Sequence, residues 1–390
     1  MTARSFLTTS FEGDAFARTL ADVRRAVDAP TAGVIFVSGA PAAQATRLAA
    51  VAQRAWRGVP TLIVPAAGVL SERGEVERDN AASGILWGGC TATPFVVGPT
   101  PLDFAEGLFD ALDDSAESVP QGRASRARTV LLFTRSDALH LQSFDPLSAH
   151  APNVCLLGAG TVGGEPVTIF PNGKIETGRA VGLSLTGLSI PIVESSPAVR
   201  LLSTFQVVDE AGAGLVLRIG GQPALDALSK AASGLANPST PGASQPVVFV
   251  ALADELPDEA GRERFVVRNI RGVDPARRGV MIGPDARVGA RCAFAVLDAA
   301  EARSDLERVA KSVRESARGS APRFGLFLSC AGRGQALYGA PDVEARILRQ
   351  RFGDLPIAGM QSAFEIGPFG PGRAKMQFFT GVLALFRSPS

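Results

Sequence analysis

Apolar residues form short, unbroken runs along the chain, and stretches with helical spacing separate several of them. The run GVIFV (33–37) is followed by a helical stretch that ends at Gly58, and then by the run TLIVP (61–65). A strand, a helix and a second strand of this kind are typical of a parallel β-α-β unit that is buried on both faces. Upstream, the apolar spacing within residues 14–27 predicts an amphipathic helix.

The same pattern occurs twice more, at TVLLFT (129–134) with NVCLLG (153–158) and at FGLFLS (324–329) with LPIAG (355–359). We interpret the three units as a degenerate structural repeat, although any buried α/β units share such features. Each first strand ends near a hydroxyl residue and each second strand leads to a glycine-bearing turn with a carboxylate. These residues are Ser38, Thr134 and Ser329, followed by Glu72, Glu165 and Glu365.

Alternating apolar and polar residues between these units predict antiparallel strands, notably within 168–187, 204–231 and 264–299. The fold class is therefore α/β, with mixed, partly parallel β-sheets and outer helices; whether sheets are stacked face to face stays open. The length of 390 residues predicts about two domains. Residues 111–128 and 233–245 have the composition of loops.

Charge and composition exclude several kinds of partner. Lys plus Arg number 39 and Asp plus Glu 38, without long runs of either sign, which argues against nucleic acid and anionic membranes as partners. The longest apolar runs are strand-sized, so we expect no membrane insertion. The first residues lack the apolar core of a signal peptide, and the four cysteines are far apart. These features predict a cytoplasmic protein.

Metal and nucleotide cofactors find little support in the sequence. The only histidines, His140 and His150, have no cysteine or acidic pair at metal-ligand spacing. The segment GAGTVGG (158–164) matches GxGxxG, but Pro166 and a β-prone run follow it where a dinucleotide-binding loop would open a helix. We therefore expect neither a metal nor a cofactor.

The segment SCAGRG (329–334) stands at a strand end, where α/β sheets present their ligand-facing loops. Cys330 is a potential nucleophile if a positive charge stabilises its thiolate, yet the C-terminal half has no histidine to serve as base; the alternatives are a ligand-facing or an inert buried cysteine. Arg333 has the geometry to hold a carboxylate. The alternative is a structural bridge to Glu365 or Asp342.

A second group of candidates follows the next strand. Glu365 stands between glycine-rich turns, where a carboxylate binds an amine or caps backbone N–H groups. Tyr338 is the only tyrosine. The complete candidate ligand-binding set is Ser329, Cys330, Arg333, Gly334, Tyr338, Gly359, Ser362 and Glu365, and no residue is assigned a catalytic role.

The ordered stretches LVLRIGGQPALDAL (215–228), VVRNIRGVDPARRGVMIGPDARVG (266–289), FLSCAGRGQALYG (327–339) and PIAGMQSAFEIGPFG (356–370) resemble the C-terminal domain of the FIST family of bacterial signal-transduction proteins. The N-terminal half resembles the FIST N-terminal domain more loosely. The resemblance implies an N-terminal domain over 30–195 and a C-terminal domain over 200–387. Two positions depart from the family pattern: Met376-Gln377 replaces a Leu-His pair, and the turn at Gly68 lacks a cysteine.

The family resemblance implies a sensory module that binds a small ligand, such as an amino acid, and acts on a separate signalling output protein; it brings no catalytic residues. The leading hypothesis is therefore an intracellular sensor rather than an enzyme, with Arg333 holding a carboxylate and Glu365 an amine. Two alternatives remain open: an enzyme that uses Cys330 as nucleophile, and a protein-binding adaptor that has no small ligand.

Overall fold

The computed structural model describes residues 2–98, 106–107, 109–110, 128–139, 154–235, 246–254, 256–257, 261, 263–317, 319–370 and 373–388. Its chain divides into two compact units. Unit 1 comprises Met1–Ser196, Arg303–Met376 and Thr380–Ser390, and unit 2 comprises Pro197–Ala302 and Gln377–Phe379. The family-domain boundaries expected from the sequence cut the chain elsewhere and stay a prediction.

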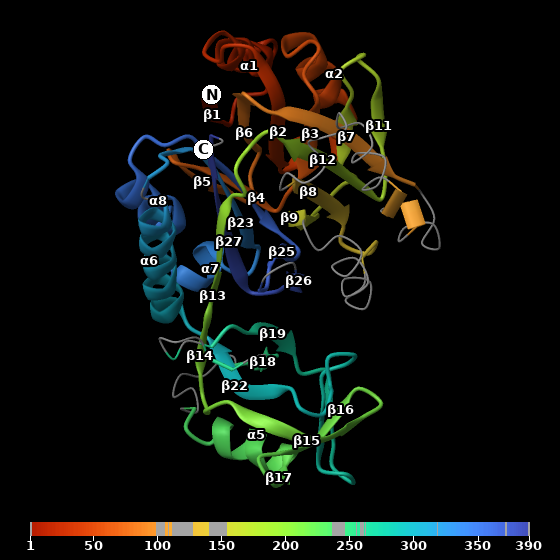
Figure 1. Cartoon of the computed structure of the whole chain (residues 1–390), viewed down its shortest axis with the longest axis vertical. Coiled ribbons are helices and arrows are strands. Elements are labelled where there is room, and N and C mark those ends of the chain that lie inside the picture. The colour runs from red at the N-terminus through yellow and green to blue at the C-terminus, as the bar shows by residue number, and fades with distance from the viewer. Residues whose placement is uncertain are drawn as a thin grey trace. The chain divides into compact units, whose positions relative to one another are not determined.

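The described residues of unit 1 form three six-stranded sheets with one common plan (Figure 1). Sheet I has the strand order β1 (Ala3–Thr8), β6 (Ala81–Gly88), β2 (Pro30–Ser38), β3 (Thr61–Pro65), β10 (Val167–Ile169), β11 (Ile175–Thr177). Sheet II has the order β7 (Thr91–Val97), β12 (Ala180–Thr186), β8 (Arg128–Arg135), β9 (Val154–Thr161), β25 (Glu365–Pro368), β26 (Ala374–Gln377). Sheet III has the order β13 (Ile192–Pro197), β27 (Thr380–Arg387), β23 (Pro322–Cys330), β24 (Ile357–Ser362), β4 (Gly68–Ser71), β5 (Gly74–Glu77).

The predicted repeat is confirmed by this common plan. The two central strands of each sheet, β2 with β3, β8 with β9 and β23 with β24, are parallel, and they are the strand pairs expected from the apolar runs. An antiparallel strand (β6, β12 or β27) flanks each pair on one side. The predicted α/β class, with mixed and partly parallel sheets and outer helices, is therefore confirmed.

On its other side, each parallel pair of strands is hydrogen-bonded to a hairpin, and this hairpin follows a different parallel pair in the sequence. Strands β4 and β5 follow the parallel pair of sheet I but belong to sheet III. Strands β25 and β26 follow the pair of sheet III but belong to sheet II, and β10 and β11 follow the pair of sheet II but belong to sheet I. Equivalent backbone hydrogen bonds mark the three crossings: Ala67 N to Gln361 O at 2.9 Å, Ala363 N to Gly160 O at 3.0 Å and Val162 N to Pro65 O at 3.2 Å. The three repeats are thus joined in a cycle.

The crossings require close approach of the chain. A Cβ atom on Gly160 would lie 2.6 Å from the ring of Phe364, which arrives from the third repeat. The strand register also shows which positions of the three repeats are equivalent. Val37 faces Pro65 in sheet I, Thr134 faces Gly160 in sheet II, and Ser329 faces Gln361 in sheet III. Ser38 therefore lies one residue beyond the position that Thr134 and Ser329 share.

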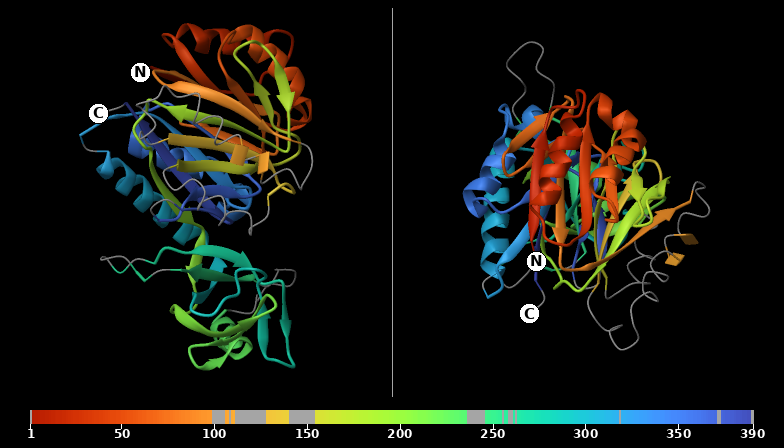
Figure 2. Two further views of the ribbon diagram at one scale, coloured as in Figure 1. Left: turned by 45° about the vertical axis from the view of Figure 1, so that its right-hand side comes forward. Right: turned by 90° about the horizontal axis from the view of Figure 1, so that it is seen from above.

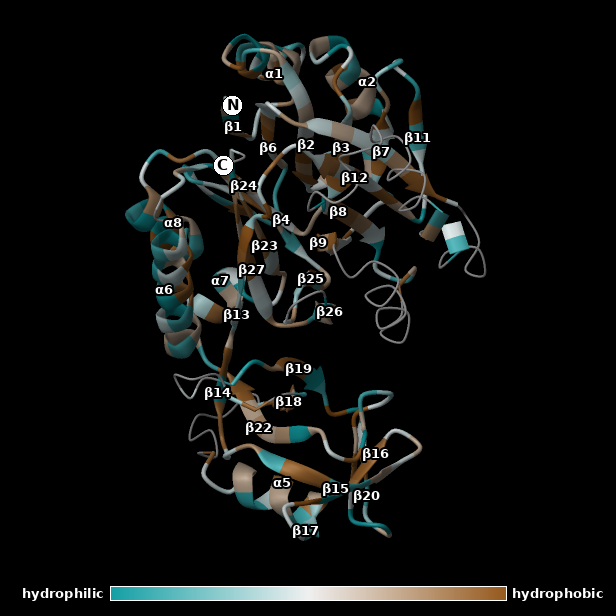
Figure 3. Ribbon diagram, in the orientation of Figure 1, coloured by the Kyte–Doolittle hydropathy of each residue, from teal (hydrophilic) through white to brown (hydrophobic). Residues whose placement is uncertain are grey.

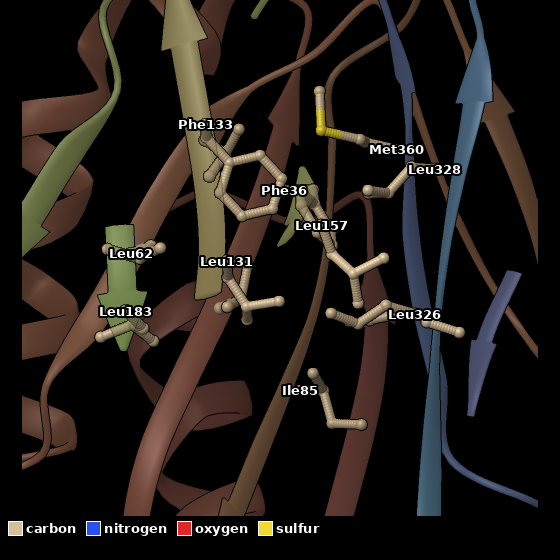
Figure 4. Packing of buried hydrophobic residues seen from close by; sticks show 14 of the residues in the cluster. Phe36, Leu62, Ile85, Leu131, Phe133, Leu157, Leu183, Leu326, Leu328 and Met360 are labelled. Carbon is tan, nitrogen blue, oxygen red and sulfur yellow. The ribbon is translucent and has the colours of Figure 1, made fainter. Parts of the chain in front are cut away.

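One apolar core joins the three sheets (Figure 4). Phe36 from sheet I meets Phe133 from sheet II edge to face, with 5.6 Å between ring centroids. Leu326 and Met360 bring sheet III into the same cluster. Burial of these faces explains why the strands appear in the sequence as nearly continuous apolar runs.

Helices cover the outside of unit 1. The helices α1 (Ala15–Arg25) and α2 (Ala45–Ala55), with the short η1 (Ala40–Gln44) before α2, lie on the outer face of sheet I, as Figure 2 shows. The helices α6 (Ala299–Ser316), α7 (Gly334–Tyr338) and α8 (Val343–Phe352) belong to the side of sheet III. Figure 3 colours much of α6 as hydrophilic, while Leu306, Val309 and Val313 on its inner side are buried. This is the pattern of a surface helix.

Unit 2 is built on a sheet that has nine strands in the described residues. The path runs β19 (Val266–Asn269), β18 (Val248–Ala253), β22 (Arg291–Leu297), β15 (Gln206–Gly212), β16 (Leu215–Ile219), β21 (Gly279–Met281), β20 (Gly272–Asp274), with β14 (Val199–Leu201) beside β22 and β17 (Gln222–Pro223) beside β16. The helix α5 (Ala224–Ala232) lies against β16 and β21. Phe249 and Phe379, 4.5 Å apart between centroids, pack at its core.

Candidate functional site

The candidate site lies in unit 1, at the carboxyl ends of the parallel strands β23 and β24. Ser329 and Cys330 are the last residues of β23, and Cys330 faces Ser362, the last residue of β24. In parallel sheets these ends hold the loops that face ligands. The loop after β23 turns at the exposed Ala331 and Gly332 and leads into α7.

A fully buried guanidinium organises the site. Arg333 is 0% exposed, and each of its three nitrogens donates a hydrogen bond. Nε binds Glu344 Oε1 at 2.6 Å, Nη1 binds the Ser196 carbonyl oxygen at 2.6 Å, and Nη2 binds the Tyr338 hydroxyl at 2.9 Å. Burial is the largest single effect and lowers the pKa of Arg333, but Glu344, Tyr338 and Glu365 together outweigh it and raise that pKa above its usual value.

Glu344 is the partner that makes burial of this charge possible. Besides Arg333, its carboxylate accepts hydrogen bonds from Ser329 Oγ at 2.7 Å and from the Tyr338 hydroxyl at 2.9 Å. Burial, and then the charge of Glu344, raise the pKa of Tyr338, so that its hydroxyl keeps its proton and donates it. Arg333, Glu344, Tyr338 and Ser329 thus form one closed hydrogen-bonded cluster, which we call the Arg333 network.

Glu365 lies beside this network with far fewer partners. Its side chain is 0% exposed, and Ser362 Oγ is placed to donate to its Oε1 at 2.8 Å. Within the described residues its Oε2 has no hydrogen-bond partner. Burial raises the pKa of Glu365 well above its usual value, against weaker opposing effects of Ser362, Arg333 and the Thr380 backbone. Burial therefore favours the protonated carboxyl group over the carboxylate.

Carboxylates from the β4–β5 hairpin hold the two helices that carry the network. Glu77 Oε1 accepts a hydrogen bond from Gln335 N at 2.7 Å in α7, and Glu75 Oε1 accepts one from Ala345 N in α8. In return, Asp342 Oδ1 accepts a hydrogen bond from Glu75 N at 2.6 Å. Acidic groups at helix N-termini satisfy free N–H groups and the helix dipole. The first repeat thereby positions residues of the third.

Glu75 makes the stability of the fold depend on pH. Burial, and then the charge of Glu344, raise the pKa of Glu75 to about 8. The folded state therefore retains a proton that the unfolded state has already lost, and stability falls as pH rises from the usual carboxyl range through about 8. We expect Glu75→Gln, which cannot titrate, to match the wild type at pH 5 and to be more stable at pH 8 by roughly 3 kcal/mol.

Urea denaturation of both proteins at pH 5, 6.5 and 8 measures this difference. Glu307→Gln, at an exposed position of α6, is the matched control and should follow the wild type at every pH. Parallel pH profiles for wild type and Glu75→Gln would contradict the assignment of a bound proton to Glu75.

Most of the residues expected from the sequence lie together. Ser329, Arg333 and Tyr338 belong to the Arg333 network, Ser362 and Glu365 adjoin it, and Cys330, 7% exposed, ends the strand beside it. The predicted bridge of Arg333 to an acid is present, although its partner is Glu344 rather than Glu365 or Asp342.

The two glycines of the set have packing roles in the structure. Gly334 opens α7 against the carboxylate of Glu77, which occupies the space that a Cβ atom would need. Gly359 lies in the middle of β24, three residues before the strand end, and a Cβ there would meet the Phe327 carbonyl oxygen and the side chain of Leu70.

Sequence reasoning missed Glu344, Ser196 and Glu75. A signal for Glu344 was present, because it precedes the buried Leu348 by one helical turn and so lies on the apolar stripe of α8. A carboxylate on such a stripe is almost never buried without a partner. Ser196 and Glu75 come from distant strands, and no local pattern marks them.

The remaining candidate chemistry is limited. Burial raises the pKa values of Cys155 and Cys292 to about 12, so both thiols are inert near neutral pH. No group of three or more His, Cys, Asp or Glu side chains suited to a metal occurs among the described residues. His140 and His150, for which metal binding was not expected, lie outside them. Among the helices described, none is both long and apolar enough to cross a membrane.

Comparison with known proteins identifies a matching domain family and relatives of this chain. Residues 224–368 match the model of the FIST C domain. An uncharacterized protein of Mycobacterium bovis is 32% identical over 267 residues, which cover 64% of this chain and 67% of that protein. An uncharacterized protein of Mycobacterium tuberculosis is 28% identical over 364 residues, which cover 92% of this chain and 91% of that protein. The matched domain includes the whole Arg333 network and Glu365, but not Ser196, whose carbonyl oxygen accepts from Arg333. A match to the FIST N domain is not shown.

Proposed function

Because the chain belongs to the family of proteins that carry a FIST C domain, a signal-transduction sensory domain, we propose that it is a sensor whose small ligand binds beside the Arg333 network. The ligand is amino-acid-like, and its amine binds Glu365. The observation that carries the proposal is the unpartnered Glu365 Oε2, a fully buried acceptor at the carboxyl ends of two parallel strands. Buried polar groups are nearly always hydrogen-bonded in folded proteins, so this oxygen needs a partner, and we infer that a ligand supplies it.

Arg333 serves this site as a positioning residue. All three of its nitrogens already donate to protein acceptors, so a ligand carboxylate would have to displace one of those bonds. The sequence-based assignment of Arg333 to a ligand carboxylate is therefore less well supported than that of Glu365 to an amine. Arg333 instead fixes Glu344 and Tyr338, which form the wall of the site.

The connections of the network support a sensory role. Within the described residues the chain passes between units 1 and 2 at four places, and three of these begin at a unit 1 residue bound to the site. The Ser196 carbonyl accepts from Arg333, Arg303 donates to the Tyr338 carbonyl at 2.6 Å, and the backbone of Thr380 faces the Glu365 carboxyl. A ligand that shifts the network therefore acts on the segments that lead into unit 2, and through them on a separate output protein in the cytoplasm.

We expect amino acids or related amines to raise the melting temperature of the wild type, because a ligand at about 100 times its Kd adds about 2.7 kcal/mol of stability. Glu365→Gln should lose this response, since an amide binds an ammonium group less well than a carboxylate does. A thermal-shift screen of both proteins and of the Glu307→Gln control measures it. A response that survives in Glu365→Gln would place the ligand elsewhere.

The enzyme alternative rests on Cys330. Its side chain is 7% exposed, and no described histidine is available as its base. The structure therefore offers less support for a nucleophile at this position than for a binding site at Glu365.

A further inference from the structure

The fully buried core of the site holds more acid than base. Glu344 and Glu365 are both 0% exposed, and Arg333, also 0% exposed, is the cation among them. Arg303 lies over the ring of Tyr338 at 5.5 Å, and its guanidinium donates to the Tyr338 carbonyl oxygen. Two ionised carboxylates would leave this core with an uncompensated negative charge, which is costly in a protein interior.

The two carboxyl groups differ in how well their hydrogen bonds stabilise a negative charge. Glu344 accepts three hydrogen bonds, from Arg333, Tyr338 and Ser329, and is satisfied as an anion. Glu365 is offered the Ser362 hydroxyl and a weaker contribution from the Thr380 backbone, and the same hydroxyl is also placed to donate to the Ser329 carbonyl oxygen at 3.0 Å. A hydroxyl has one proton to give, so these two acceptors compete for it. A positive charge that balances the second carboxylate of this core is therefore needed at Glu365 rather than at Glu344.

The groups that face Glu365 act in opposite directions, and burial, the largest effect, favours the protonated carboxyl group. Arg333 favours the anion of Glu365 from a distance, the Thr380 backbone donates weakly, and Glu344 opposes a second negative charge. Glu75, on the β4–β5 hairpin, faces Glu344 and adds to the acidity of the region. In the free protein a proton on Glu365 is the simplest way to balance these charges.

We propose that the ligand is a small organic cation, an amine or a guanidine compound, whose charge replaces the proton of Glu365. This inference rests on the proposed function and names the class of its ligand. The protonated carboxyl group gives its proton to the buffer, and the resulting carboxylate pairs with the ligand cation, so one proton leaves for each ligand bound. The ammonium or guanidinium donors then have Glu365 Oε2 as an acceptor.

A second unpartnered acceptor lies next to the network. Ser196 Oγ is buried and has no hydrogen-bond partner within the described residues, while the carbonyl oxygen of Ser196 is held by Arg333. An ammonium group carries three donors and a guanidinium five, so such a ligand has donors for both atoms. The loop residues Ala331 and Gly332, directly before Arg333, are exposed to solvent.

Isothermal titration with three matched compounds tests the charge of the ligand. The compounds are an amino acid, the amine left when its carboxyl group is removed, and its N-acetyl derivative. We expect the amine to bind at least as tightly as the amino acid, and the N-acetyl derivative at least ten-fold more weakly. Tightest binding by the N-acetyl derivative would overturn the proposal while leaving a small-ligand sensor in place.

Proton release provides the second readout. Titration of the amine in phosphate and in MOPS, which differ in enthalpy of ionisation, should show about one proton released per ligand, and affinity should rise with pH by up to ten-fold per unit. Glu365→Gln resembles the protonated carboxyl group, so it should unfold within a few degrees of the wild type, yet bind at least ten-fold more weakly without proton release. Glu307→Gln should retain both properties.

The outcomes separate the two proposals. Amine binding without proton release, or with unchanged affinity in Glu365→Gln, would overturn the cation-for-proton exchange and leave the sensor in place. Binding of no compound of any charge would contradict both proposals.

Discussion

Replacement of Arg333 by alanine is expected to lower the free energy of unfolding by about 3–5 kcal/mol. The substitution removes the buried guanidinium at the site and leaves Glu344 without its ion-pair partner. It also removes the donors to the Tyr338 hydroxyl and the Ser196 carbonyl. Urea denaturation at pH 7 measures the loss.

Two further variants distinguish charge from side-chain loss. Arg349→Ala, on the exposed side of α8, should change stability by less than about 0.5 kcal/mol. The double variant Arg333→Leu with Glu344→Leu should recover much of the loss, because apolar residues often replace a buried ion pair at little cost. A loss below about 1 kcal/mol in Arg333→Ala would contradict the central place of this ion pair.

The hairpins that join the sheets of other repeats should prevent parts of the chain from folding alone. A fragment of residues 200–387, which contains the FIST C domain, should not fold by itself, because its strand β24 loses β4 and its strands β25 and β26 lose β9. The fragment 1–196 should fail for the same reason. Circular dichroism and urea titration should show no cooperative transition in the 1–196 fragment, and in the 200–387 fragment none beyond that of unit 2, which has its own core.

Co-expression of the two fragments is the complementary test. We expect them to associate and to unfold cooperatively as a complex, because each supplies the strands that the other lacks. A cooperative transition of the 200–387 fragment alone, at the denaturant midpoint of the whole chain, would contradict the structural dependence of the repeats.

The central strands were predictable because burial on both faces leaves a direct mark on the sequence. GVIFV and TLIVP became β2 and β3, and the helix expected within 14–27 is α1. A continuous apolar run of strand length requires only local information. The equal plan of the three repeats followed from the recurrence of that run.

The partners of the hairpins were not predictable from one sequence. Val69 pairs with Met360 across most of the chain, and nothing in the GVLS segment identifies that strand. Hairpin register is a local property, but attachment of a hairpin to a distant sheet depends on tertiary packing. The carboxylates that follow the second strands also differ in register, since Glu365 faces Ala159 while Glu165 precedes β10.

The site was predictable to the extent that strand ends attract polar residues. Ser329, Arg333, Ser362 and Glu365 come from two such ends, and the structure brings them together. The choice of Glu344 as partner of Arg333 depends on the angle at which α8 meets β23, which local spacing does not specify. Gly359 is the opposite case. It was expected to contact a ligand, but it lies in the middle of β24, where the Phe327 carbonyl oxygen and Leu70 leave no room for a side chain.

The most direct test of the central claim is a thermal-shift comparison of wild type, Glu365→Gln and Glu307→Gln against amino acids and their amines. We expect a compound with an amine to stabilise wild type and Glu307→Gln by about 2.7 kcal/mol at 100 times its Kd, and to leave Glu365→Gln unchanged. Equal stabilisation of all three proteins, or stabilisation of none, would contradict a ligand site at Glu365.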